Sequence, residues 1–144
     1  AGFAMDFDLD LAVEQSSDNP VFYVQYAHAR ICSLMKKLEA DGVAVRTPTR
    51  EELLLLSSPE EIQLIRKLAL LPGTIIGVAN RYDTAALTHY AIEVATLFHK
   101  FYTNCRVAGE EDSIMQARIA LCGAVRTVIA NLLSLMKISA PQSM

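Results

Sequence analysis

The sequence predicts an all-α protein, a bundle of about five helices, and three observations lead to this prediction. Apolar residues recur at three- and four-residue steps through most of the chain. Residues that cap helices stand before these stretches, with Pro or Glu at the expected spacing. The sequence has no pair of alternating segments joined by a tight turn, the pattern of a β-hairpin. With 144 residues, 52% of them apolar, the chain is long enough to form one domain with a core.

The opening stretch, residues 1–18, is acidic and contains no Lys or Arg. Its apolar residues alternate around Phe7, Leu9 and Leu11, so we expect an extended or irregular lead-in or linker from an upstream domain that is absent here. The first five residues lack the basic region and the long apolar run of a secretory signal. Residues 19–144 are expected to form the helical domain.

The first long helix is predicted over residues 20–41. Asn19 is suited to capping its free N–H groups, and Pro20 suits the first helical position because its missing N–H costs nothing there. Gly42 offers a stop. The residues expected to share the inward face are Val24, Ala27, Ile31, Leu34 and Leu38.

A loop over residues 43–48 should precede a short helical turn that begins with a capping box at Thr49. A second capping box, Ser58 with Glu61, predicts a helix that Pro72 and Gly73 end. A short helix over residues 74–82 follows. The inward residues are expected to be Ile62, Ile65, Leu68 and Ala69 in the former helix and Ile75, Val78 and Ala79 in the latter.

Two further long helices complete the bundle, over residues 84–105 and 113–136, with a loop around Gly109 between them and a tail from Ile138 to Met144. Asp83 or Thr84 is expected to cap the first of them. The predicted buried residues are Leu87, Tyr90 or Ala91, Val94, Leu97, Phe98, Phe101, Ala117, Leu121, Ala124, Val125, Val128, Ile129 and Leu132.

Charge and cysteine content limit the possible functions. The formal net charge is −3, whereas a general nucleic-acid binder is usually basic, so any RNA contact must be small and local. Three widely spaced cysteines fit buried thiols in a reducing cytosol. Neither Cys-x-x-Cys nor His-x-x-x-His occurs, so no metal site is expected. No continuous apolar run reaches the length of a membrane span.

One group of side chains on the first helix could bind RNA. Tyr23, Tyr26 and Arg30 fall within about 60° of one another on the helix, beside the apolar stripe. Aromatic rings and a guanidinium can stack on a base and hold a phosphate. The same residues could instead be half-buried Tyr rings and a solvated charge. Of the histidines, His28 is expected to have a structural role and His89 to lie on the surface. For His99, both possibilities remain open.

Several motifs of the sequence, taken in order, resemble those of one protein family. Residues 20–30, Pro-Val-Phe-Tyr-Val-Gln-Tyr-Ala-His-Ala-Arg, look like the first long helix of the DALR-type anticodon-binding domain at the C-terminal end of arginyl-tRNA synthetases. The resemblance covers nearly the whole chain. The other matching pieces are Phe7 to Ala12, Gln15 to Asn19, Phe98 to Tyr102, Cys105 to Val107, and Ser139 to Pro141 with Met144.

The resemblance implies an RNA-binding site for the anticodon loop of arginine tRNA. In the family, the Tyr at position 102 contacts this loop, and the terminal Met helps form the pocket for the central base. Every arginine codon has G in the middle, so every arginine anticodon has C there, and a domain serving arginine should read that base. We therefore expect Tyr23, Tyr26, Arg30, Tyr102 and Met144 to form the site.

The resemblance also implies what lies outside this chain. The His-x-Gly-His and Lys-Met-Ser-Lys-Ser motifs, with which synthetases of this class hold ATP, are absent. We expect ATP and Mg to be used by an upstream catalytic domain, no catalytic residue and no cofactor here, a cytoplasmic location, no membrane contact and a monomer. Lys137 departs from the family, which often has Gly before the tail, and this leaves the entry angle of the tail open.

Two other functions remain open from the residues alone. A related class I synthetase domain, such as that of the glycine or cysteine enzymes, would share the bundle but not this tail. A helical protein-interaction module without RNA binding would fit the acidic balance and the high apolar content. A free-standing enzyme has no supporting constellation of residues, since no phosphate loop or nucleophile elbow is present.

Overall fold

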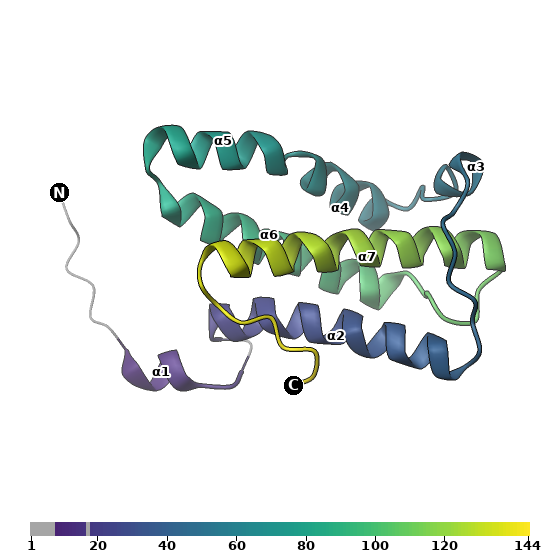
Figure 1. The fold of residues 1–144 in the computed structure, drawn as a ribbon, viewed down its shortest axis with the longest axis horizontal. Coiled ribbons are helices and arrows are strands. Elements are labelled where there is room, and N and C mark those ends of the chain that lie inside the picture. Colours follow the sequence, from purple (N-terminus) through teal and green to yellow (C-terminus); the bar gives the residue numbers. More distant parts are fainter. Residues whose placement is uncertain (1–7, 17) are drawn as a thin grey trace.

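The structure, a computed structural model, describes residues 8–16 and 18–144 and is helical where it has regular structure (Figure 1). Phe7 and the rest of residues 1–7 in the predicted lead-in lie outside the described residues. The all-α prediction is confirmed, and five of the helices are longer than one or two turns. The helices are α1 (Leu9–Val13), α2 (Pro20–Ala40), α3 (Arg50–Leu53), α4 (Pro59–Ala69), α5 (Leu71–Arg81), α6 (Thr84–Asn104) and α7 (Asp112–Leu135).

Helix α6 lies at the centre of the bundle. It packs against α2, α4, α5 and α7, while α2 also packs along α7 (Figure 1). Helices α4 and α5 follow one another along one side of the α6–α7 pair, and α2 lies along the other side. The largest fully buried apolar side chains are Phe98, Phe101, Ile31, Leu38, Leu64, Ile129, Leu132 and Leu133. This central position lets α6 support the α2 face that carries the predicted site.

The predicted starts of α2, α3, α4 and α6 are confirmed, whereas α5 begins at Leu71 rather than at residue 74. The Asn19 side chain accepts hydrogen bonds from the N–H groups of Val21 and Phe22, and Pro20 is the first helical residue. Thr49 and Ser58 each form a full capping box. Asp83 caps α6 through the N–H of Ala86 at 3.3 Å. These starts could be predicted because capping depends on residues only a few positions apart.

The prediction of an irregular lead-in is wrong for residues 9–13, which form α1. The Asp8 carboxylate accepts from the N–H groups of Asp10 and Leu11 and so caps a short helix. The Asn19 amide then donates to the carbonyls of Ala12 and Glu14, at 3.2 and 3.0 Å. Residues 12–14 are therefore held against the start of α2.

The predicted inward face of α4 is wrong in part: Leu68 packs against the core as expected, but two of the other predicted residues do not. Ile65 and Ala69 are exposed, whereas Leu64 and Glu61 are buried. Glu61 can be buried because Arg118 Nε donates to it at 2.7 Å. Burial alone would raise the pKa of Glu61, but hydrogen bonds from Arg118 and Ser58 outweigh this effect and lower it.

Three smaller predictions about inward residues and helix ends are wrong. Pro72 and Gly73 do not end a helix but lie in the first turn of α5, where Pro is tolerated because its missing N–H has no partner in any case. Ala79 and Ala124 are exposed rather than inward. Both alanines lie on helices with apolar residues on more than one side, so the spacing alone could not select the buried face.

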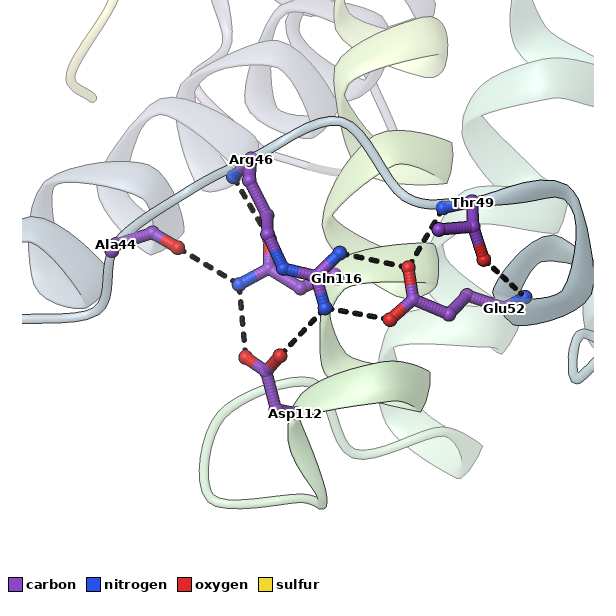
Figure 2. Close-up of polar contacts among 6 residues, drawn as sticks. All are labelled: Ala44, Arg46, Thr49, Glu52, Asp112 and Gln116. Carbon is purple, nitrogen blue, oxygen red and sulfur yellow. Dashed lines mark hydrogen bonds and ion pairs between the residues drawn. The ribbon is translucent and has the colours of Figure 1, made fainter.

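A polar network fastens the loop before α3 to the start of α7 (Figure 2). Arg46 donates to both carboxylate oxygens of Glu52 and to Asp112, at 2.6–2.8 Å. The Gln116 amide donates to the Ala44 carbonyl and accepts from the Arg46 N–H. Arg46 lowers the pKa of Glu52 to about 2, mainly through the hydrogen bond, and also lowers the pKa of Asp112.

By length and hydropathy, two helical stretches of the described residues could cross a membrane. One is α7, a core helix that is partly buried along its length. The other, Pro59–Arg81, is almost entirely unburied and comprises α4 and α5 with Leu70 between them. The exposed apolar residues in or next to this stretch include Leu54, Leu55, Ile65, Leu70 and Ile76.

Candidate RNA interface

An aromatic cluster forms where α2 meets α6. Tyr23 lies 4.9 Å from the His99 ring and Tyr26 lies 5.7 Å from it, measured between ring centroids. Phe22 is nearly parallel to Tyr26 at 6.4 Å. Tyr23 packs against the core, but Tyr26 is 42% exposed. The exposed Tyr26 ring thus lies against the rings of Phe22 and His99, a suitable base for stacking.

Arg30 and Tyr102 form the adjoining part of this surface. The Arg30 guanidinium carbon lies 4.0 Å from the centroid of the Tyr102 ring. Tyr102 in turn packs against Phe98, with 5.7 Å between ring centroids. Phe98 also contacts His99 at 5.6 Å, so the rings of Tyr26 and Tyr102 belong to one continuous cluster.

His99 is central to the cluster, although the sequence left its role open. Its Nε2 atom is buried and has no hydrogen-bond partner among the described residues. Burial lowers the pKa of His99, and the nearby charge of Arg30 lowers it further. The imidazole is therefore neutral at pH 7 and acts as an aromatic ring between the two Tyr side chains. Its position next to Phe98 was the only signal in the sequence.

The C-terminal tail turns back over α2, and Lys137 makes the turn. Lys137 has φ +60°, and the N–H groups of Lys137 and Ile138 donate to the carbonyls of Ser134 and Leu133. This is the Schellman end that Gly normally provides. It settles the entry angle that the sequence left open, and the tail then lies across the first half of α2 (Figure 1).

Two side chains of α2 hold the tail in place. Gln25 Nε2 donates to the Ser139 carbonyl at 2.8 Å, and His28 Nδ1 lies 2.8 Å from the Pro141 carbonyl. Because a carbonyl only accepts, His28 must carry its proton on Nδ1 in this contact. The predicted structural role of His28 is confirmed. His89, as predicted, lies on the surface.

Residues of the tail, of α1 and of α2 line a cavity of about 580 Å³ that is open to solvent. Phe22 lines it and also stacks on Tyr26, so the cavity adjoins the aromatic cluster. Met144 lines it as well and is half exposed. The other lining residues are Ala12, Val13, Glu14, Gln15, Asn19, Val21, Gln25, Ser139, Pro141 and Ser143.

The five residues predicted for the site occupy two adjacent places rather than one. The structure brings Tyr23 together with Tyr26, and Arg30 together with Tyr102, within one aromatic cluster. Met144 instead lines the cavity, which Phe22 also lines. Among residues 8–16 and 18–144, no group of three or more His, Cys, Asp or Glu side chains could hold a metal ion.

Comparisons with known proteins agree on one family. The model of the DALR anticodon binding domain matches residues 24–144. An arginine–tRNA ligase of Ruminiclostridium cellulolyticum is 50% identical over 144 residues, which is 100% of this chain and 26% of that protein. One of Caldanaerobacter subterraneus is 49% identical, over 97% of this chain and 25% of that protein. The chain thus spans about a quarter of the length of these curated relatives.

The fold agrees with the sequence matches. The arginyl-tRNA synthetase of Thermus thermophilus covers 97% of this chain with a TM-score of 0.80 at 25% identity, and this chain covers 24% of it. These findings do not favour the protein-interaction module or the glycine and cysteine enzymes. They confirm the resemblance that the motifs indicated. The chain therefore belongs to the family of DALR anticodon-binding domains, in the form found in arginine–tRNA ligases.

Proposed function

We propose that this chain binds the anticodon loop of arginine tRNA and reads its central C. The observation that supports this most directly is the exposed Tyr26 ring on a supported aromatic cluster, next to a cavity bounded by the C-terminal tail. A loop base that leaves its stack needs such a ring and a cavity edge with hydrogen-bonding groups. Tyr26 supplies the ring, and the cavity supplies backbone and side-chain polar groups.

Each proposed site residue then has a distinct role. Tyr26 stacks on a base, and Tyr23 supports it through His99. Arg30, whose guanidinium lies over the Tyr102 ring, contacts a base edge or a phosphate of the RNA. Met144 closes the cavity over the central base with a polarisable thioether.

A binding titration tests this function. Fluorescence anisotropy would compare two anticodon stem-loops that differ only in the central base, C or U. We expect tighter binding of the C loop and a loss of about 1–3 kcal/mol in binding free energy for Tyr26→Ala, the usual effect of removing a stacking ring. Equal affinity for both loops in the wild-type chain would contradict a reader of the central base.

Tyr82 offers a matched control for the Tyr26 variant. It is 91% exposed, has φ 55°, caps the C-terminal end of α5 and takes no part in the ring contacts of the aromatic cluster. Tyr82→Gly removes an equally large ring, and Gly suits the left-handed backbone there. This variant should bind the C loop like the wild type. A similar loss in both variants would show that the Tyr26 effect is not local.

The proposal extends to the longer protein of which such a domain is part. There, the domain would hold arginine tRNA while a preceding catalytic domain, using ATP and Mg, attaches arginine to it in the cytoplasm. Residues 1–18 would connect the two domains. We propose that the chain alone is a monomer without membrane contact, carries no catalytic residue and needs no cofactor. Light scattering would show its mass, and mixing with ATP and arginine should give no charging.

A further inference from the structure

We propose that a small basic pocket beyond Tyr102 holds a phosphate of the bound RNA strand, an inference that rests on the function proposed above. The pocket has a volume of about 260 Å³ and lies between α2, the end of α6 and the loop that follows α6. Lys37 and Arg106 line it from opposite elements. The other lining residues are Leu34, Tyr102, Cys105, Val107 and Ala108.

Tyr102 connects this pocket to the aromatic cluster. The Arg30 guanidinium lies over the Tyr102 ring, and Tyr102 also lines the pocket. Tyr26, Arg30 and Lys37 follow one another along one side of α2, within about 40° around the helix axis. An RNA strand with one base at Tyr26 can therefore continue along α2 past Arg30 toward Lys37.

Arg106 is held in position before any ligand arrives. Arg118 Nη1 donates to the Arg106 carbonyl at 2.6 Å, and Arg106 Nε donates to the Ala108 carbonyl at 2.8 Å. The guanidinium also lies over Gly109, where an added Cβ would come within 2.9 Å of Nη2. A side chain fixed in this way loses little conformational freedom when it binds an anion.

The charge of these two residues is not neutralised within the described part of the chain. Three other cations, Arg46, Lys67 and Arg118, form ion pairs with carboxylates. Lys37 and Arg106 are exposed and form no ion pair with a residue at positions 8–16 or 18–144. In a chain of net charge −3, these two cations beside the proposed RNA site indicate a local anion-binding function.

Salt dependence distinguishes a phosphate contact from a structural role. Each phosphate neutralised on single-stranded RNA contributes about 0.7 to the slope of log K against log salt concentration. Lys37→Gln or Arg106→Gln should each lower this slope by about 0.7 and the affinity about fivefold near 0.1 M salt. The loss should be equal for the C and U loops, because a phosphate carries no sequence information.

Two control variants sharpen the test. Lys37→Arg should keep the slope, and Arg126→Gln, on α7 next to a different cavity, should change neither slope nor affinity. Circular dichroism would confirm that each variant is folded. The proposal is overturned if Lys37→Gln and Arg106→Gln both bind with the wild-type slope, or if Arg126→Gln lowers the slope as much as they do.

The outcomes for the two proposals can be told apart. If the wild type prefers the C loop and the slope is unchanged in the variants, the anticodon proposal stands and the phosphate pocket is wrong. If the slope falls in the variants and the C and U loops bind equally, the phosphate pocket stands without a reader of the central base. If the wild type binds neither loop, both proposals are wrong.

Discussion

The guanidinium carbon of Arg30 lies 4.0 Å from the centre of the Tyr102 ring, so α2 and α6 contribute to one stacked pair. A guanidinium is planar and can stack on a ring while its N–H groups stay free to bind RNA. The ammonium of Lys is a compact charge and cannot replace this geometry. The pair explains why two residues 72 positions apart belong to one surface.

Arg30 variants should separate stacking from charge. Arg30→Ala should reduce affinity for the C loop about tenfold, or about 1.4 kcal/mol in binding free energy, because the stacking and the charge are both lost. Arg30→Lys should recover part of the salt dependence but not the full affinity. Anisotropy titration at two salt concentrations measures both effects, and helix content should be unchanged. Wild-type affinity in Arg30→Ala would remove Arg30 from the site.

The hydrogen bond between His28 and Pro141 should matter for RNA binding without touching RNA. His28→Ala frees the tail, so Met144 would have to be ordered when the loop binds. We expect a loss of about 1 kcal/mol in binding free energy of the C loop, comparable to one hydrogen bond. Deleting residues 142–144 in the same variant should weaken binding further, because the tail of His28→Ala can still bring Met144 over the base once the loop binds. His89→Ala, at an exposed histidine of α6, is the matched control and should bind normally.

Lys137 has a left-handed backbone, which costs a residue with a Cβ about 1–2 kcal/mol. Lys137→Gly should therefore raise the free energy of unfolding by up to about 1 kcal/mol, measured by urea denaturation. Lys36→Gly, at an exposed position inside α2, should lower it by about 1 kcal/mol. A decrease in both variants would contradict the structure of this turn.

The ion pairs of Arg46 predict a dependence of stability on acid pH. The pKa of Glu52 is about 2 in the folded chain and about 4.5 when unfolded, so the unfolded chain binds more protons between these values. The stabilisation by this pair is complete above pH 4.5 and is lost as pH falls toward 2. Asp112, whose pKa is also lowered, acts in the same direction.

Replacing Arg46 should remove this part of the acid sensitivity. Arg46→Gln should be less stable than the wild type at pH 7, and the difference should shrink as pH falls from 4.5 toward 2. Thermal unfolding at several pH values measures it. Arg126→Gln, at an exposed Arg without an ion pair among the described residues, should keep the wild-type profile. A constant difference between Arg46→Gln and wild type across this range would contradict the assignment.

The sequence by itself determined the five longer helices, the starts of α2, α3, α4 and α6, and the face of α2 that carries Tyr23, Tyr26 and Arg30. Capping and helical periodicity act over three or four residues, so the helix starts at Asn19 and Ser58 can be predicted from the local sequence alone. Only the tertiary structure decided which side of α4 is buried, because Arg118 on a distant helix makes the burial of Glu61 possible. It also decided that His99 supports both Tyr rings and that Met144 lines a cavity beside Phe22. These contacts join residues far apart in the chain, and no local pattern specifies them.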